Sequence, residues 1–116
     1  MRNLINRVQL IGNLGMDVET KELEKGGKLA KVAIATNEYY LKDGEKQQKT
    51  EWHNLVAWGN TAKMFSDMCS KGSRVAVQGK LTNRSWENPA GEKQYRTEIV
   101  VDEFYIMAPR KDSIPL

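Results

Sequence analysis

Three tryptophans lie among polar and basic residues, where a residue type that is usually buried is unexpected. Trp52 and Trp58 are six residues apart, so on a strand both side chains point to the same face. Trp86 follows Arg84 by two positions and has no apolar neighbour in the sequence. Large aromatic faces beside cations form a platform on which any unpaired nucleic-acid base can stack while the cations contact phosphates. The alternative, that all three are core residues, fits Trp58 best and Trp86 least.

The charge distribution agrees with this interpretation. The chain carries a formal net charge of +3 and has a pI near 9.0, a mildly basic balance that many unrelated proteins share. The stretch from Lys71 to Arg96 holds six basic residues against two acidic ones, and it contains Trp86 and Tyr95. A run of charges alone usually indicates a solvated surface, whereas interleaved basic and aromatic residues favour a surface that binds nucleic acid.

Length and composition limit the other classes of protein. With 116 residues the chain can form one domain with its own core, and we expect residues 1–109 to form this domain and residues 110–116 a short tail. No apolar run approaches the ~20 residues of a membrane helix, and the first residues lack the apolar stretch of a signal peptide. A single cysteine and a single histidine supply neither an internal disulfide nor a zinc site. We therefore expect a cytoplasmic, nucleoid-associated protein without metal or cofactor.

Hydrophobic periodicity predicts an all-β chain with one helix. Alternating apolar and polar residues predict strands at residues 4–14, 18–23, 29–40, 50–58, 75–81 and 95–107, the second of them short and exposed. Helical spacing at residues 60–69 gives an apolar stripe of Met64, Phe65, Met68 and Cys69. Five or so strands, with the short second one left out of the count and one helix between strands 3 and 4, is the order of a five-stranded Greek-key barrel of the oligonucleotide-binding (OB) type. The polar stretches 42–49 and 83–93 are expected to be loops beside its binding face.

Four ordered segments carry a resemblance to a known family. They are residues 6–15 (NRVQLIGNLG), 50–59 (TEWHNLVAWG), 71–81 (KGSRVAVQGKL) and 97–101 (TEIVV). In this order and at these spacings they resemble bacterial single-stranded DNA-binding proteins, and the resemblance extends over residues 4–110. It implies an OB-fold protomer that assembles as a homotetramer, around which single-stranded DNA wraps.

The resemblance also implies which residues stack on bases. Trp52 and Trp86 match two base-stacking tryptophans of the family. Tyr40 takes the position of a third, and Trp58 takes the position of a stacking phenylalanine. Tyrosine offers a smaller aromatic face than tryptophan, and tryptophan a larger one than phenylalanine, so we expect the total stacking to be similar.

Two neighbours of Trp52 differ in their implied roles. His53 matches a histidine at the subunit interface of the family, and it points to the opposite strand face from Trp52. Asn54 stands where the family often has a basic residue, which removes one phosphate contact. The expected DNA-binding residues are Tyr40, Trp52, Asn54, Trp58, Arg74, Lys80, Arg84, Trp86, Lys93 and Tyr95, and the expected interface residues are His53, Leu4 and Val8.

The last residues of the sequence differ from the family pattern. Family members usually carry a long linker that ends in an acidic tip, and this tip recruits other proteins. Here Arg110 and Lys111 oppose the acidic character of such a tip. The residues Asp112, Ile114, Pro115 and Leu116 resemble such a tip but contain a single acidic residue. We therefore expect weak or absent recruitment of replication and repair proteins through them.

Three functions are compared on these features. The favoured one is sequence-independent binding and protection of single-stranded DNA in replication, repair or recombination, by base stacking and by phosphate contacts from lysine and arginine. The second is an interaction module of the replication-restart machinery, similar to primosomal replication protein N, which needs fewer stacking aromatic residues. The third is an enzyme that uses His53 and Cys69 as a nucleophile pair, but no acidic cluster or phosphate-binding glycine loop accompanies them. We therefore expect no enzymatic activity.

Overall fold

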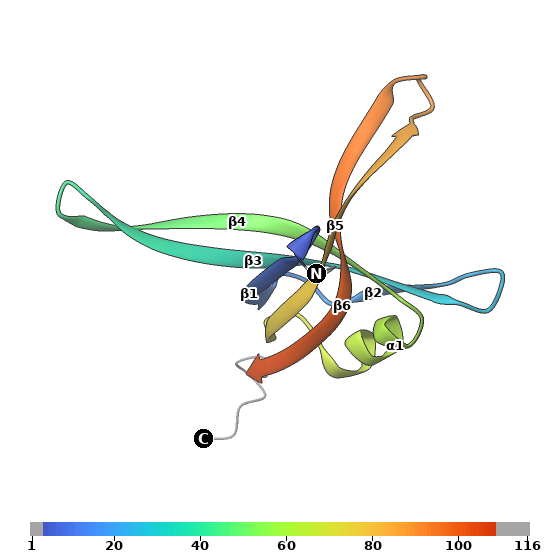
Figure 1. Cartoon of the computed structure of the whole chain (residues 1–116), viewed down its shortest axis with the longest axis horizontal. Coiled ribbons are helices and arrows are strands. Elements are labelled where there is room, and N and C mark those ends of the chain that lie inside the picture. Colours follow the sequence, from blue (N-terminus) through green and yellow to red (C-terminus); the bar gives the residue numbers. More distant parts are fainter. Residues whose placement is uncertain (1–3, 109–116) are drawn as a thin grey trace.

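The computed structural model describes residues 4–108 of the chain, and within this range it contains six strands and one helix (Figure 1). The alternation of apolar and polar residues produces strands close to the expected ones, and helical spacing produces the helix in the expected place. The elements are β1 (Val8–Leu14), β2 (Glu19–Glu22), β3 (Lys28–Lys42), β4 (Glu45–Trp58), α1 (Gly59–Met68), β5 (Arg74–Glu87) and β6 (Lys93–Ala108).

Five of the strands close into a barrel. Their order is β1-β5-β6-β4-β3, and a further pairing of β1 with β3 closes the ring, while β2 pairs with β3 alone. All pairings are antiparallel except the one between β4 and β6. Helix α1 follows β4 and precedes β5, the third and fourth strands of the ring in chain order. The expected OB-type barrel with one helix between strands 3 and 4 is confirmed.

Two glycines allow the barrel strands to approach each other closely. A Cβ atom on Gly12 would clash with the backbone carbonyl of Ala35, next to the point where β1 meets β3. A Cβ atom on Gly79 would clash with the carbonyl of Val100, beside an irregularity in the β5–β6 register. Larger side chains at either position would therefore push apart strands whose pairing closes the barrel.

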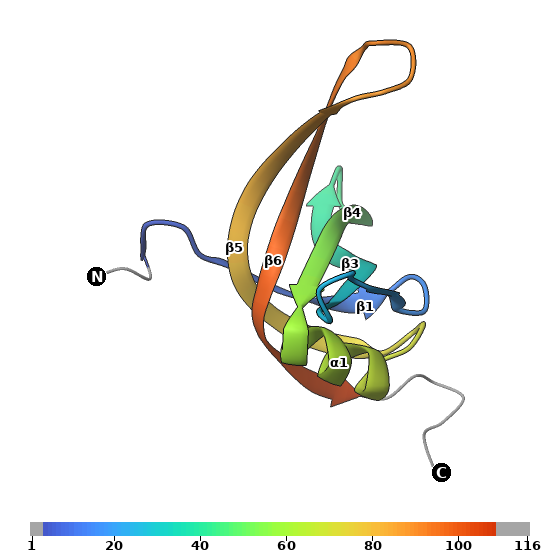
Figure 2. The same cartoon turned by 90° about the vertical axis from the view of Figure 1, so that its right-hand side faces the viewer.

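The core lies inside the barrel, and α1 covers one end of it (Figure 2). The helix buries Ala62 and Phe65, and the Phe65 ring meets the Phe104 ring edge-on at a centroid distance of 4.8 Å. Met64 and Met68 are exposed, so the expected helix stripe is wrong at these two positions. The helix contacts the barrel end through the face that carries Ala62 and Phe65, and Met64 and Met68 lie outside this face.

Two long hairpin arms project from the barrel, one formed by β3 and β4 and the other by β5 and β6, and the β2–β3 hairpin extends from it as well (Figure 1). The radius of gyration is 16.3 Å, against about 13 Å for a compact chain of about 100 residues. Asp43 and Gly44 form the turn of the β3–β4 arm with φ angles of 52° and 79°. The stretches 42–49 and 83–93, expected to be loops, are mostly strand. Both faces of each arm are solvated, so their polar sequences lack the alternation that identifies a half-buried strand.

Candidate nucleic-acid interface

The two faces of β4 define the surface on which two tryptophans lie. Leu55 and Ala57 point into the core, so the even positions 52–58 lie on the other face of β4, where Val56 is buried but the two tryptophans are not. Trp52 is 60% exposed and Trp58 is 49% exposed. Their six-residue separation corresponds to roughly 20 Å along the strand. Trp58 is therefore a surface residue, contrary to the interpretation of it as part of the core.

Strand register extends this surface across the sheet. Trp52 pairs with Ala35 of β3, and β4 lies beside β6 with Val56 paired to Val100. On β5 and β6, Arg84 pairs with Arg96 and Trp86 pairs with Gln94. We call this surface the outer face; it consists of the odd positions 29–39 of β3 and the even positions 52–58 of β4, 80–86 of β5 and 94–100 of β6.

Trp52 is held at the barrel by packing. Gly15, just after β1, donates its backbone N–H to the carbonyl of Ala33 at 3.0 Å. A Cβ atom on Gly15 would clash with ring atoms Cζ3 and Cη2 of Trp52, so the indole ring lies directly against this glycine. The ring therefore has one supported side, while most of its surface remains open for a base.

Trp86 lies on the β5–β6 arm and has a cation beside it. It is 42% exposed, and the Arg84 guanidinium lies 5.0 Å from the centre of its ring. This distance is within the range of a cation–π interaction. An aromatic ring and a cation at such close range can contact a base and its neighbouring phosphate together.

A charged network joins the two tryptophan sites. Arg96 donates from Nη2 to Oδ1 of Asn54 at 2.9 Å, which links β6 to the strand that carries Trp52. Glu98 lies between two arginines, with Oε1 3.4 Å from Nε of Arg84 and Oε2 3.6 Å from Nε of Arg96. The Glu98 side chain is only 8% exposed. The outer face is therefore one connected surface from β4 to the β5–β6 arm.

The structure gathers most of the sequence-predicted DNA-binding residues on the outer face, but not all of them. Tyr40 pairs with Gln47 on the opposite face of the β3–β4 arm from Trp52. Tyr95 pairs with Ser85 on the opposite face of the β5–β6 arm, and its ring lies 5.6 Å from Lys93 Nζ. Arg74 lies at the other end of β5. Those on the outer face are Trp52, Asn54, Trp58, Lys80, Arg84 and Trp86.

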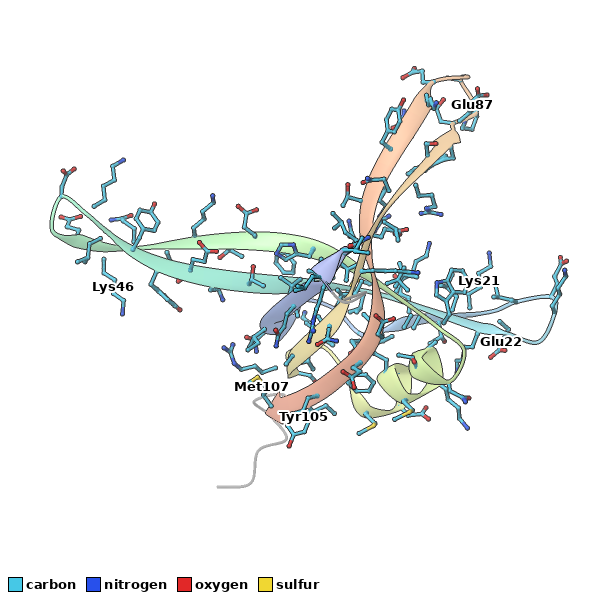
Figure 3. All side chains as sticks on the ribbon, in the orientation of Figure 1. Lys21, Glu22, Lys46, Glu87, Tyr105 and Met107 are labelled. Atoms are coloured by element: carbon cyan, nitrogen blue, oxygen red, sulfur yellow. The ribbon has the colours of Figure 1, made fainter. Side chains whose placement is uncertain are left out.

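Two residues at the β3–β4 arm were not singled out as binding residues, namely Tyr39, an aromatic residue before the stretch 42–49, and Lys46 within that stretch. Tyr39 is on the outer face, is 62% exposed and has Lys46 Nζ 5.1 Å from its ring centre. Figure 3 shows Lys46 near the tip of this arm. The register carries the missing signal, because a two-residue turn at Asp43–Gly44 pairs Tyr39 with Gln48 and Ala35 with Trp52. Arg96 was counted within the basic stretch but was not singled out as a binding residue.

Three polar residues fill the outer face between Tyr39 and Trp52. Oδ1 of Asn37 accepts hydrogen bonds from Thr50 Oγ1 at 2.7 Å and from Gln48 Nε2 at 3.1 Å. Gln48 also donates to Thr50 at 3.4 Å. These bonds join the three side chains into one polar strip between the two aromatic rings.

The expected interface residues lie elsewhere. His53 pairs with Ile34 and points to the inner side of its strand, where Nε2 lies 3.0 Å from Thr36 Oγ1. Leu4 is exposed, and Val8 is partly buried against the core at the start of β1. The residues of the expected tip, Asp112, Ile114, Pro115 and Leu116, lie outside the described part of the chain.

Cys69, which with His53 was considered as a nucleophile pair, is buried in the core. Burial raises the pKa of the Cys69 thiol to about 11, which keeps the nucleophilic thiolate scarce at neutral pH. Within residues 4–108 no three His, Cys, Asp or Glu side chains form a group that could hold a metal ion. No helix in the same part of the chain is long and apolar enough to cross a membrane.

Comparisons with known proteins identify the family. Residues 5–107 match the single-strand binding protein family. Single-stranded DNA-binding protein 1 of Xylella fastidiosa (strain 9a5c) is 37% identical over 111 residues, covering 94% of this chain and 82% of that protein. The protein of the same name from Chlorobaculum tepidum is 42% identical over 111 residues, covering 94% of this chain and 68% of that protein. A solved structure of Plasmodium falciparum SSB in complex with ssDNA has a TM-score of 0.79 and 31% identity, covering 89% of this chain and 95% of that one. This chain, with its OB-type barrel and its exposed outer-face tryptophans, belongs to the single-strand binding protein family.

Proposed function

We propose that this chain binds single-stranded DNA on the outer face, independently of sequence, and protects exposed strands during replication, repair or recombination. The observation that carries the proposal is the exposure of Trp52, Trp58 and Trp86, between 42% and 60%, on one connected surface. Every base has an aromatic face, so stacking tolerates any sequence. An interaction module that bridges proteins would not need three such tryptophans among cations.

Cations on the outer face supply the phosphate contacts in this proposal. Lys80, Arg84 and Arg96 are on β5 and β6, on the same side of the sheet as the tryptophans. Each phosphate that such a residue neutralises releases a counterion, so the affinity falls as the salt concentration rises. The chain acts here by binding and not by catalysis, in the cytoplasm where the nucleoid lies.

A titration of tryptophan fluorescence with oligo(dT) at several salt concentrations tests the proposal. We expect quenching on binding and a log–log salt slope of about −0.7 for each phosphate neutralised. Duplex DNA of equal length is the control, and it should bind much more weakly because its bases are already stacked. Equal affinity for duplex DNA, or unchanged fluorescence at saturation, would exclude a stacking platform.

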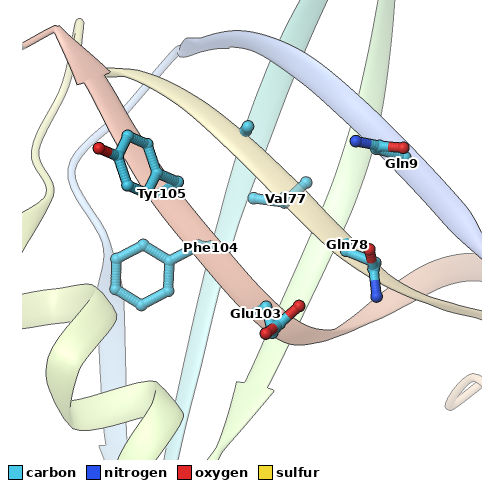
Figure 4. A pocket seen from close by; sticks show the side chains of 7 residues that line it. Gln9, Val77, Gln78, Glu103, Phe104 and Tyr105 are labelled. Atoms are coloured by element: carbon cyan, nitrogen blue, oxygen red, sulfur yellow. The ribbon is translucent and has the colours of Figure 1, made fainter.

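We further propose that the chain assembles as a homotetramer. The edge of β1 from Val8 to Gly12 that faces away from β5 has no paired strand within residues 4–108, and an unpaired edge is a template for a second copy. On the outward side of β1, β5 and β6, Ile11, Tyr105 and Met107 are exposed beside a shallow cavity of about 240 Å³ (Figure 4). A further copy that packs against this side would cover these apolar groups.

Light scattering tests the assembly and the role of His53. We expect a tetrameric mass for the parent and a lower mass for His53→Lys at high dilution, because the longer side chain would crowd the interface and its charge would lose water there. Val8, at the start of the open edge of β1, and Leu4, four residues before it in the chain, are expected to contribute to the assembly as well. A monomeric parent, or a His53→Lys protein that stays tetrameric at high dilution, contradicts this assignment.

We also propose that residues 112–116 recruit other proteins weakly or not at all. A carboxylate in a basic pocket gains chiefly from charge-assisted hydrogen bonds. Asp112 is the acidic residue here, and Arg110 and Lys111 precede it directly. Deleting residues 112–116 should leave the affinity for DNA nearly unchanged. A pull-down in which the undeleted chain captures replication or repair enzymes strongly, and loses them on deletion, would show the opposite.

A further inference from the structure

Glu98 is an unexpected residue for a surface that binds a polyanion. It lies on β6 in the middle of the outer face, and its side chain is 8% exposed, whereas the side chains of Arg84 and Arg96 are 50% and 40% exposed. A buried carboxylate repels phosphates and costs free energy to desolvate. Such a residue needs a compensating role in this position.

The register of β5 and β6 indicates what that role is. Arg84 and Arg96 are directly opposite each other, and like charges in this arrangement destabilise a sheet. One carboxylate oxygen of Glu98 faces Nε of each arginine, at 3.4 Å and 3.6 Å. Among the described residues, Arg96 Nε and Glu98 Oε2 are buried without a hydrogen bond, so their contact is an ion pair alone. Glu98 thus offsets the repulsion between the two guanidinium groups.

Both arginines use their remaining surface to contact the binding residues. Arg84 presents its guanidinium to the Trp86 ring at 5.0 Å. Arg96 donates from Nη2 to Asn54 at 2.9 Å, two residues along β4 from Trp52. Glu98 contacts only Nε of each guanidinium, so Nη2 of Arg96 and the guanidinium group of Arg84 remain available for these contacts. The two tryptophan sites are therefore connected through one carboxylate.

We propose that Glu98 is a positioning residue for single-stranded DNA binding. It fixes Arg84 against Trp86 and Arg96 against Asn54 before DNA arrives, so less side-chain entropy is lost when the strand binds. This inference rests on the proposed function of the outer face. It opposes the expectation from charge alone, because removing a carboxylate from this surface should strengthen DNA binding if Glu98 only repels phosphates.

The test compares two substitutions that remove the same charge. Glu98→Gln keeps the side-chain volume but cannot pair with two guanidinium groups, and Glu87→Gln is the matched control near the tip of the same arm (Figure 3). We expect Glu87→Gln to bind oligo(dT) as tightly as the parent or more tightly. Glu98→Gln should bind between about two- and tenfold more weakly at low salt, because two arginine side chains lose their order.

Two further variants separate positioning from a loss of folding. Arg84→Lys keeps the net charge and changes a half-exposed side chain, but it loses the planar guanidinium that contacts Glu98 and Trp86 together. We expect weaker binding with an unchanged unfolding temperature. In a Trp86→Ala background, Glu98→Gln should weaken binding by a smaller factor than it does in the parent, because one of the groups that it positions is absent.

The outcomes distinguish this inference from the proposed function. If the parent binds oligo(dT) and Trp52→Ala weakens binding, the outer face is the binding surface whatever Glu98 does. If Glu98→Gln then binds as tightly as Glu87→Gln and Arg84→Lys binds like the parent, the positioning role is wrong. If Glu98→Gln does not fold, Arg84→Lys alone decides, since parent-like binding would overturn the inference and weaker binding would support it.

Discussion

Trp52 and Trp86 lie on the same outer face, but different forces hold them in place. The Trp52 ring lies directly against Gly15 at the barrel wall, and its strand pairs with β3 along its full length. Trp86 lies far out on the β5–β6 arm, where Arg84 is the cation beside its ring and Glu98 anchors that arginine. One site depends on packing and the other on charge.

This difference predicts different responses to salt. Van der Waals contact between an indole ring and a glycine does not depend on ionic strength, so we expect the Trp52 ring to keep its position as salt rises. Ion pairs of a half-exposed arginine are screened as salt rises, so the Trp86 site loses order before the Trp52 site does. The outer face thus combines a rigid site at the barrel with a salt-dependent site on an arm.

Replacing the two tryptophans gives the largest expected effects. Trp52→Ala should cost 1–3 kcal/mol of binding free energy, roughly 5- to 150-fold in affinity, at low and high salt alike. Trp86→Ala should cost a similar amount of binding free energy at low salt and a smaller amount at high salt. Its unfolding temperature should change little, because the arm is outside the core. Titrations of oligo(dT) at several salt concentrations measure both. Parent-like binding by Trp86→Ala would remove the arm from the binding site.

Gly15→Ala tests whether packing positions the Trp52 ring. The added Cβ atom overlaps the ring and forces it to move, and we expect a loss between about 1 and 2 kcal/mol of binding free energy. In a Trp52→Ala background the same substitution should cost almost nothing, because there is no ring to displace. Equal losses in the two backgrounds would mean that Gly15 affects DNA binding by another route.

Tyr39 and Tyr40 offer a matched comparison of the two faces of the β3–β4 arm. The register places Tyr39 on the outer face with Trp52, whereas the family resemblance assigns base stacking to Tyr40 on the opposite face. Tyr39→Ala should cost about 1 kcal/mol for a strand long enough to pass Trp52 and reach the arm, with Tyr39→Phe binding like the parent. A strand too short to reach the arm should not distinguish the variants. If only Tyr40→Ala weakens binding, the strand leaves the outer face before it reaches Tyr39.

The sequence predicted the barrel and the exposure of Trp52 and Trp86 well because both depend on local patterns. Strand alternation is set by burial on one face, and a tryptophan without apolar neighbours, such as Trp86, signals exposure directly. The arms were predicted poorly, since both of their faces are solvated and no alternation remains to reveal strands. The turns at Asp43–Gly44 and at Asn88–Gly91 fix the register of the two arms, and a one-residue shift of register moves every side chain to the other face.

The network around Glu98 was also beyond the reach of the sequence. Arg84, Arg96 and Asn54 come from three strands, and their contacts depend on a parallel pairing of β4 with β6 that no local pattern encodes. Glu98 itself is an ordinary carboxylate in a strand of the last motif. Its proposed positioning role can be inferred only from the two arginines that the fold brings to either side of it.

Lys80 and Lys93 offer a comparison of phosphate contacts on the two faces of the β5–β6 strands. Their replacement should have the smallest effect on DNA binding. Lys80 lies on the outer face of β5, and Lys93 lies beside Tyr95 on the other face of the arm. If DNA stays on the outer face, Lys80→Gln should make the log–log salt slope shallower by about 0.7 and Lys93→Gln should not change it. Each substitution removes one positive charge, so any effect of net charge is the same in both proteins. Equal changes of slope would mean that the strand contacts both faces of the arm, and Tyr95 would then become a candidate for base stacking.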